Sequence, residues 1–444
     1  MKRFFALLSV FCALCPVLCT GGARAASVIQ DTEIESVVYE LVIPLARAAG
    51  IKDGRLKIHI LGDDDFNAFV MGGEDVYIYT GLISRIETPG AFQAVIAHEL
   101  GHMIGGHVAQ MSAHMRAEMM RSMIIQALGV ALMVAGGNPG LGMGVMAGAG
   151  GIANAGLMSF SRDEERLADN AGLELMVKAG LDPNGFIKIM KQMNDIQGAA
   201  EQKINPNRIN HPVTAERLEN AKKWIAEHKE NKKKVTENNR IIEKYAVIQA
   251  KIIGYLSPAP RVRAIYQPLD RTDAAVYANS IASMRAGNLE DAKTGTLTLI
   301  ARMPVNPFYY ELLGDIEYQY GHYDDSVKAY EKSLDLLKNS KSPQIQTALA
   351  LVLSERAKPG DADRAVEMAK RALLVQQSPL AYWVLSRAEN MRKNAGASDW
   401  AMAEYYMMAK DKKKAREYAT RAQKKLPKDS PEYIKSGDIL AGSK

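Results

Sequence analysis

The chain has 444 residues, of which 47% are hydrophobic and 24% are charged, and its formal net charge is +6. This composition excludes collagen-like and disordered proteins and is typical of a globular protein with two or three domains. The formal net charge falls to +3 without the first 25 residues, because these contain Lys2, Arg3 and Arg24 and no acidic residue. So small an excess predicts no nucleic-acid partner.

Residues 1–25 predict a secretory signal peptide. Two basic residues are followed by an apolar run of about 16 residues and by Ala23-Arg24-Ala25, which is typical of a cleavage site. A membrane anchor is the alternative, but a span needs about 20 apolar residues, so cleavage is favoured. All three cysteines lie in this segment, so no disulfide is expected in the mature chain. We therefore expect a protein of the bacterial periplasm.

The segment after the leader predicts a small sheet followed by a helix. The glycine pair in Gly72-Gly73-Glu74-Asp75 is typical of a hairpin turn, and Thr88-Pro89-Gly90 interrupts the chain before the helix. In chain order the patterns predict a helix at 32–49, a strand at 56–60, hairpin strands at 67–71 and 76–79, and a helix at 92–110.

Two apolar segments, 123–137 and 141–157, are rich in Met, Ala and Gly. Each is shorter than a comfortable membrane span. They predict a helical hairpin that packs in the core, with peripheral contact to a membrane surface or a tight transmembrane hairpin as the alternatives.

The remainder of the chain is predicted to be helical and to begin a second domain near residue 257. An amphipathic pattern covers 161–193 with a break at 180–183, and a linker helix at 238–253 precedes Ser257-Pro258-Ala259-Pro260. We therefore expect a signal peptide at 1–25, a catalytic domain at 26–256 and a repeat domain at 257–444.

The repeat domain is predicted from small residues that recur at similar spacing. Tetratricopeptide units are helix pairs of about 34 residues with small residues at set positions and an aromatic residue in the second helix. Residues 307–340 match with Gly314, Ser326, Tyr330 and Ser333. Further matches are Ala365, Ala369 and Ala372 before Pro379, then Ala415, Ala419 and Ala422 before Pro427, and a weaker copy with Gly287, Ala292 and Pro304. A generic array of helical hairpins is the alternative, but the spacing favours a tetratricopeptide-like solenoid.

The chemistry is predicted from the sequence His98-Glu99-Leu100-Gly101-His102. On a helix the two histidines share one face and can bind one metal ion. A catalytic zinc site needs three protein ligands, and Glu99 is placed to activate the zinc-bound water as a general base. A chance occurrence of the pattern is the alternative, and the predicted helix weighs against it.

A third ligand is predicted in the helix that begins near Ser161. The metzincin pattern is excluded because position 108 is Val, and His107 is expected to be a packing or hydrogen-bonding residue. Glu165 is the better ligand, and Asp169, one helical turn later, can orient a metal-binding histidine.

These motifs together resemble a known family. The HELGH motif followed by Ser161-Arg162, Glu165 and Ala168-Asp169 is similar to the gluzincin family of HtpX and the CAAX prenyl endopeptidases. The leader and the repeats resemble its BepA-like periplasmic zinc proteases. The resemblance covers essentially the whole mature chain and implies an α+β, mainly helical fold, in which a zincin-like domain with a small β-sheet precedes an all-α tetratricopeptide solenoid.

The resemblance also implies further site residues. Asn210-His211-Pro212 to Arg217 is similar to a late element of the family, which implies that His211 stabilises the oxyanion or occupies the water position as a fourth ligand, and that Arg217 stabilises charge. An exposed histidine at a helix start is the alternative for His211. The edge strand of the hairpin is implied to hold extended substrate.

Two functions are compatible with these features. The first is a periplasmic zinc endopeptidase with one Zn²⁺ per chain, which hydrolyses unfolded or misassembled outer-membrane proteins and whose repeats contact the outer-membrane assembly machinery. The second is an assembly factor or chaperone that works through its repeats and has a silent zinc site. Glu99 favours the first, because a structural zinc site needs no base.

Overall fold

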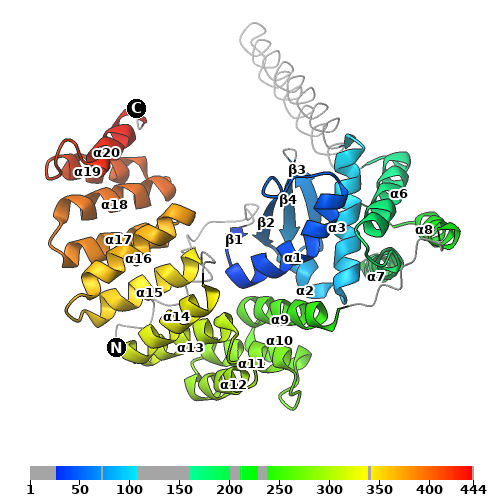
Figure 1. Cartoon of the computed structure of the whole chain (residues 1–444), viewed down its shortest axis with the longest axis horizontal. Helices are drawn as coiled ribbons and strands as arrows, with labels where there is room; N and C mark the ends of the chain where they lie inside the picture. Colours follow the sequence, from blue (N-terminus) through cyan, green and yellow to red (C-terminus); the bar gives the residue numbers. More distant parts are fainter. Residues whose placement is uncertain are drawn as a thin grey trace, which may run out of the picture. The chain divides into compact units, whose positions relative to one another are not determined.

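A computed structural model describes residues 27–71, 74–107, 160–200, 211, 213–228, 238–338 and 342–442. The chain divides into two compact units (Figure 1). One contains Ala25–Ile29 and Glu35–Tyr245, and the other contains Gln30–Ile34 and Ala246–Lys444. The predicted leader, the hairpin glycines and both apolar segments between 123 and 157 lie outside the described residues.

The first unit contains a four-stranded sheet with the order β1-β2-β4-β3. The predicted hairpin is confirmed, because Ala68 pairs with Ile78 and Met71 pairs with Asp75 in antiparallel register. Strand β2 runs parallel to β4, and β1 was not predicted. The strands are β1 (Ser27–Ile29), β2 (Lys57–Gly62), β3 (Ala68–Met71) and β4 (Asp75–Tyr79). Alternation along β4 buries Val76 and Ile78.

Helix α3 (Pro89–Ile104) lies between the sheet and α6 (Figure 1). It begins where Thr88 Oγ1 accepts a hydrogen bond from the backbone N–H of Ala91 at 3.2 Å. The helix was predicted to continue to residue 110 but ends at Ile104, because Gly106 turns the backbone with φ of +72°. The other helices of this unit are α1 (Thr32–Ala48), α2 (Thr80–Arg85), α6 (Arg162–Lys178), α7 (Asn184–Ala200) and α8 (Ala215–Glu227).

The second unit is an array of helices in which, from α10 onward, each packs against the next. Helices α9 (Asn239–Leu256) and α10 (Ala259–Ile265) precede five helix pairs, whose first helices begin 33 to 36 residues apart. The pairs are α11 (Asp273–Arg285) with α12 (Leu289–Arg302), α13 (Pro307–Tyr320) with α14 (Tyr323–Leu337), α15 (Pro343–Arg356) with α16 (Asp361–Val375), α17 (Pro379–Met391) with α18 (Ala395–Met408), and α19 (Lys412–Gln423) with α20 (Pro431–Gly442).

The residues that predicted the repeats pack the helix pairs together. A Cβ atom on Gly314 would lie 2.7 Å from the ring of Tyr330, so only glycine allows α13 to approach that ring. Ser326 donates a hydrogen bond to the Gly314 carbonyl at 2.8 Å. The small residues Ala365, Ala369, Ala372, Ala415, Ala419 and Ala422 are all buried. The predicted fold class, α+β and mainly helical with a tetratricopeptide-like array, is confirmed.

The two units divide within α9, between Tyr245 and Ala246. Tyr245 packs against Phe92, and its hydroxyl donates a hydrogen bond to the carbonyl of Ile83 at 3.1 Å in the first unit. The domain boundary expected between residues 256 and 257 falls at the end of α9 and stays a prediction.

A buried ion cluster in the second unit fixes residues 30–34. Lys251 Nζ lies 2.8 Å from Asp31, 3.1 Å from Glu33 and 3.3 Å from Glu311. Tyr277 donates a hydrogen bond to Glu33 at 2.9 Å. Because several carboxylates surround this ammonium group, its charge is compensated despite burial.

Among the described residues, no helix has the length and apolar character needed to cross a bilayer. The apolar segments at 123–137 and 141–157 are not among these residues. The expected contact with a membrane surface therefore stays a prediction.

Candidate active site

Helix α3 carries the three residues of the predicted motif. His98, Glu99 and His102 are all buried, since α3 is covered on several sides by the sheet, α6 and α7. The four-residue spacing places the two imidazoles on one face, and their Nε2 atoms lie 3.1 Å apart. The prediction that they share one face of a helix is confirmed.

Helix α6 brings Glu165 and Asp169 to the same place. It begins with a capping box, in which Ser161 and Glu164 exchange hydrogen bonds between side chain and backbone. Gly101 lets α3 and α6 approach closely, because a Cβ atom there would lie 2.5 Å from the carbonyl oxygen of Ala168. This close packing puts the carboxylate of Glu165 beside the histidines of α3.

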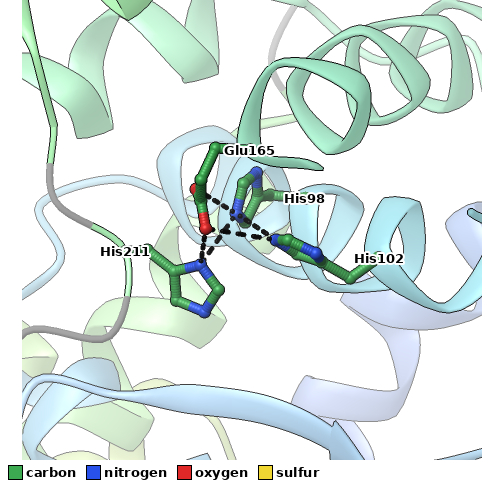
Figure 2. A group of neighbouring side chains, drawn as sticks. All are labelled: His98, His102, Glu165 and His211. Carbon is green, nitrogen blue, oxygen red and sulfur yellow. Dashed lines mark hydrogen bonds and ion pairs between the residues drawn. The ribbon is translucent and has the colours of Figure 1, made fainter. Parts of the chain in front are cut away.

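Four side chains form a cluster that could hold a metal ion: His98, His102, Glu165 and His211. Their candidate ligand atoms all lie within 4.8 Å of one another, and Figure 2 shows the side chains converging. His98 Nε2 is 3.4 Å from Glu165 Oε2 and 3.3 Å from His211 Nδ1. His102 Nε2 is 3.5 Å from Glu165 Oε1, and His211 Nδ1 is 2.6 Å from the same oxygen.

The spacing of these atoms fits a tetrahedral metal ion. With metal–ligand distances of about 2.0–2.2 Å, neighbouring ligand atoms of a tetrahedral zinc site lie about 3.3 Å apart. Most of the separations in the cluster are close to this value. Imidazole nitrogens and a carboxylate oxygen are also the donors that zinc prefers. The residues therefore fit a bound divalent metal.

Asp169 and Arg217 support the cluster from outside. Asp169 Oδ1 lies 2.9 Å from His98 Nδ1, so it orients the imidazole whose other nitrogen faces the cluster. Arg217 donates two hydrogen bonds of 2.8 Å to Asp169, and its third nitrogen lies 2.7 Å from Glu165. Arg217 is placed by α8, where Thr214 caps the helix by accepting from the Arg217 backbone N–H.

The electrostatics of the metal-free cluster depend on these partners. Burial lowers the pKa of His98, but Asp169 and Glu165 outweigh it and raise that pKa to about 9. Burial lowers the pKa of His102 to about 4. Hydrogen bonds from imidazoles keep the pKa of Glu165 well below its usual range in spite of burial. A metal ion would have to displace the proton of His98, because ligands bind in their deprotonated form.

Glu99 lies at the edge of the cluster and is not one of its candidate ligands. Its side chain is buried, and Oε1 lies 3.6 Å from His211 Nε2. Burial raises the pKa of Glu99, which makes it a better proton acceptor than an exposed glutamate. His211 thus contacts Glu99 with one nitrogen and the ligand cluster with the other.

Two aromatic neighbours of His102 complete the site. His107 Nδ1 lies 3.1 Å from His102 Nδ1, which confirms His107 as a hydrogen-bonding residue. Phe160 stacks on His102 with ring centroids 3.9 Å apart. Phe160 was not predicted as a site residue. Its position directly before Ser161, the N-cap of α6, was the feature of the sequence that could have indicated it.

All the predicted site residues lie together in the structure. The three motif residues come from α3, and Glu165 and Asp169 from α6; His211 lies in the loop before α8, and Arg217 in its first turn. His211 is close to the ligands rather than exposed, since its side chain is 12% accessible. The individual roles of these residues stay predictions.

Comparison with known proteins identifies the family of the first unit. Residues 29–225 match the family described as peptidase family M48. The chain is 22% identical over 395 residues to the Beta-barrel assembly-enhancing protease of Escherichia coli K12, with 87% of this chain and 78% of that protein covered. It is 28% identical over 180 residues to the Mitochondrial metalloendopeptidase OMA1 of Schizosaccharomyces pombe, which covers 40% of this chain and 49% of that protein.

One solved structure is also similar to this chain. It is a thermophilic TPR protein of Thermus thermophilus, with 19% identity over 44% of this chain and 93% of that chain and a TM-score of 0.25. The family match, the relatives and the ligand cluster agree on the chemistry of the first unit. Residues 29–225 are therefore a peptidase family M48 domain, and the chain is a metalloendopeptidase.

Proposed function

We propose that this metalloendopeptidase is a periplasmic zinc enzyme that cleaves misfolded or misassembled outer-membrane proteins. The observation that carries the proposal is the cluster of His98, His102 and Glu165 with Glu99 beside it. Two histidines, one glutamate and a separate buried glutamate match the ligands and the general base of a catalytic zinc site. Zinc is favoured over other divalent metals by these ligand types.

In this proposal Glu99 accepts a proton from the attacking water and later donates it to the leaving amine. Its buried position and raised pKa suit both steps, because a general base works best with a pKa near the working pH. When bound, the metal would supply Lewis-acid chemistry at the site. His98 and His102 hold the metal together with Glu165.

Substrate and location are proposed from the relatives and the sequence. The name of the Escherichia coli relative refers to β-barrel assembly, which supports outer-membrane proteins as substrates of this chain. The predicted leader supports a periplasmic location. The helical repeats present a surface for protein partners, and we propose that they bring the enzyme to the assembly machinery.

A second candidate is an assembly factor with a latent zinc site. The position of His211 supports it, because its Nδ1 lies 3.3 Å from His98 Nε2 and is one of four atoms that could bind the same metal ion. A catalytic zinc site leaves the fourth ligand position open for water or substrate. In this state the repeats could act while hydrolysis is switched off.

The test is hydrolysis of casein by the purified full chain. We expect hydrolysis by the untreated protein, loss of it after metal removal by a chelator, and recovery when Zn²⁺ is restored. The control is a chelated sample that receives Mg²⁺, which prefers oxygen ligands and should not restore activity. Hydrolysis that continues after complete metal removal would exclude the proposed mechanism.

Replacing His211 with alanine tests whether this residue restrains the site. If it occupies the fourth ligand position, His211→Ala should hydrolyse casein faster and should retain one zinc ion per chain. If it stabilises the oxyanion instead, the same change should lower kcat by about 10²- to 10³-fold. Zinc content and kcat measured on the same samples distinguish the two roles. An unchanged kcat with unchanged zinc content would exclude both roles of His211.

A further inference from the structure

We propose that His107 is a positioning residue that holds the metal ligand His102 in its binding tautomer. The inference rests on the proposed metal site, but it concerns a residue outside the candidate ligand set. His102 faces the other ligands through Nε2, which lies 3.1 Å from His98 Nε2. A neutral imidazole that binds through Nε2 carries its proton on Nδ1.

The Nδ1–H group of His102 needs an acceptor, because the residue is buried. That acceptor is His107 Nδ1, at 3.1 Å. The contact orients both rings: His102 donates, and His107 carries its own proton on Nε2. Both side chains are buried, at 1% and 5% exposed, so water does not replace this hydrogen bond. Asp169 lies beside the corresponding nitrogen of His98, with Oδ1 2.9 Å from Nδ1.

The two glycines that follow α3 allow His107 to lie beside His102. Helix α3 ends at Ile104, and Gly106 turns the chain with φ of +72°, a conformation that favours glycine. Gly105 provides room for the ring, since a Cβ atom there would lie 2.7 Å from Cε1 and Nε2 of His107. Gly105 has an ordinary helical φ of −66°, so the space and not the backbone requires glycine here. Gly105 and Gly106 therefore both contribute to the position of the His107 imidazole.

The two ligand histidines have acceptors of different charge. His98 contacts a carboxylate, whereas His102 contacts an imidazole. Glu99, Glu165 and Asp169 are already buried in this site. A neutral acceptor orients His102 without adding a fourth buried negative charge. Phe160 stacks on His102 and limits the ring to this orientation.

The experiment compares the zinc affinity of variants of the full chain by competition with a chromophoric chelator. His107→Leu removes the acceptor and should weaken zinc binding by about 10- to 100-fold, the usual effect of removing such a partner. His107→Asn should retain affinity close to that of the unchanged chain, because its Oδ1 stands where Nδ1 of the imidazole lies. His228→Leu, at the end of α8, is the matched histidine control and should have no effect.

A second variant tests the same contact without removing the imidazole. Gly105→Ala should displace the His107 ring and weaken zinc binding in the same direction as His107→Leu. The double variant should lose little more zinc affinity than either single variant, because both changes break the same hydrogen bond between His102 and His107. If His107→Leu does not fold, Gly105→Ala decides the question. Unchanged affinity in a folded Gly105→Ala or His107→Leu variant would overturn the inference.

The tautomer gives a readout that a merely structural role would not change. In the zinc-loaded protein with ¹⁵N-labelled histidine, His102 should show a protected Nδ1 proton, which persists in His107→Asn and is lost in His107→Leu. A different result would contradict the proposed zinc site itself: the unchanged chain would bind no zinc, or His98→Ala would bind zinc as tightly as the unchanged chain. Zinc bound normally by the unchanged chain and by His107→Leu would refute only the role of His107.

Discussion

Replacing Glu99 with glutamine is expected to lower kcat for casein hydrolysis by about 10²- to 10⁴-fold, the range for loss of a general base. The amide has nearly the same shape as the carboxylate but cannot accept the proton of the attacking water. Glu99 is not among the candidate ligands, so zinc content should remain one ion per chain. The measurement is kcat together with metal analysis on the same preparation.

The matched control for this change is Glu174→Gln. Glu174 lies on the exposed side of α6, so the same loss of one charge should leave kcat unaltered. A Glu99→Gln protein that hydrolyses casein at the original rate would show that another group is the base. Loss of zinc from this variant would instead show that Glu99 has a structural role in the cluster.

Replacing Arg217 with leucine is expected to destabilise the metal-free protein by about 3–5 kcal/mol, as in other buried ion pairs that lose one partner. The side chain is 11% exposed and compensates two buried carboxylates, Asp169 and Glu165, with contacts of 2.7–2.8 Å. Leucine would remove this guanidinium from both carboxylates and leave them only the imidazole of His98 as a shared cationic partner. Unfolding in denaturant at pH 7, followed by a signal from the first unit, measures the loss.

The destabilisation should diminish at low pH. Hydrogen bonds from His98 and Arg217 lower the pKa of Asp169 in the folded protein, although burial opposes them. A carboxyl group with a lowered folded pKa contributes stability above its unfolded pKa of about 3.9, and this contribution is lost as the pH falls. The difference between Arg217→Leu and the unchanged protein should therefore be fully present at pH 7 and should decrease only as the pH falls below about 4, where Asp169 becomes protonated in the folded protein.

The control for Arg217 is Arg166→Leu on α6. Arg166 forms an exposed ion pair with Asp163, so its loss should change stability by less than about 1 kcal/mol. An Arg217→Leu protein that unfolds at the same denaturant concentration as the unchanged chain would show that the buried carboxylates do not depend on this cation. Arg217→Lys should recover only part of the stability, because a single ammonium group cannot replace the bidentate contact.

Local patterns were sufficient to predict the helix that carries His98 and His102 and the helical repeats. Helical spacing alone placed His98 and His102 on one face, since four residues make about one turn. The same rule placed Glu165 and Asp169 on one face of α6, where both are buried. Small residues at recurring positions predicted the helix pairs, because these positions are where helices come into contact.

Local sequence patterns were less successful at predicting short elements and the ends of elements. Strand β1 has three residues and pairs with β2, so its own sequence carried too little periodicity to predict it. The end of α3 was placed too late, because the apolar pattern continues past Gly106 while the backbone turns there. Helix α2, which follows β4 directly, was missed because it has only six residues.

Residue type and spacing within one helix were enough to predict a set of metal ligands and a glutamate base, because a four-residue spacing places two side chains on one face. The tertiary structure decided how those groups are supported. His211 reaches Glu165 across 46 residues, Arg217 reaches Asp169 across 48, and His107 returns to His102 through two glycines. Such contacts depend on how α3, α6 and the loop before α8 pack together, and no local periodicity encodes that arrangement.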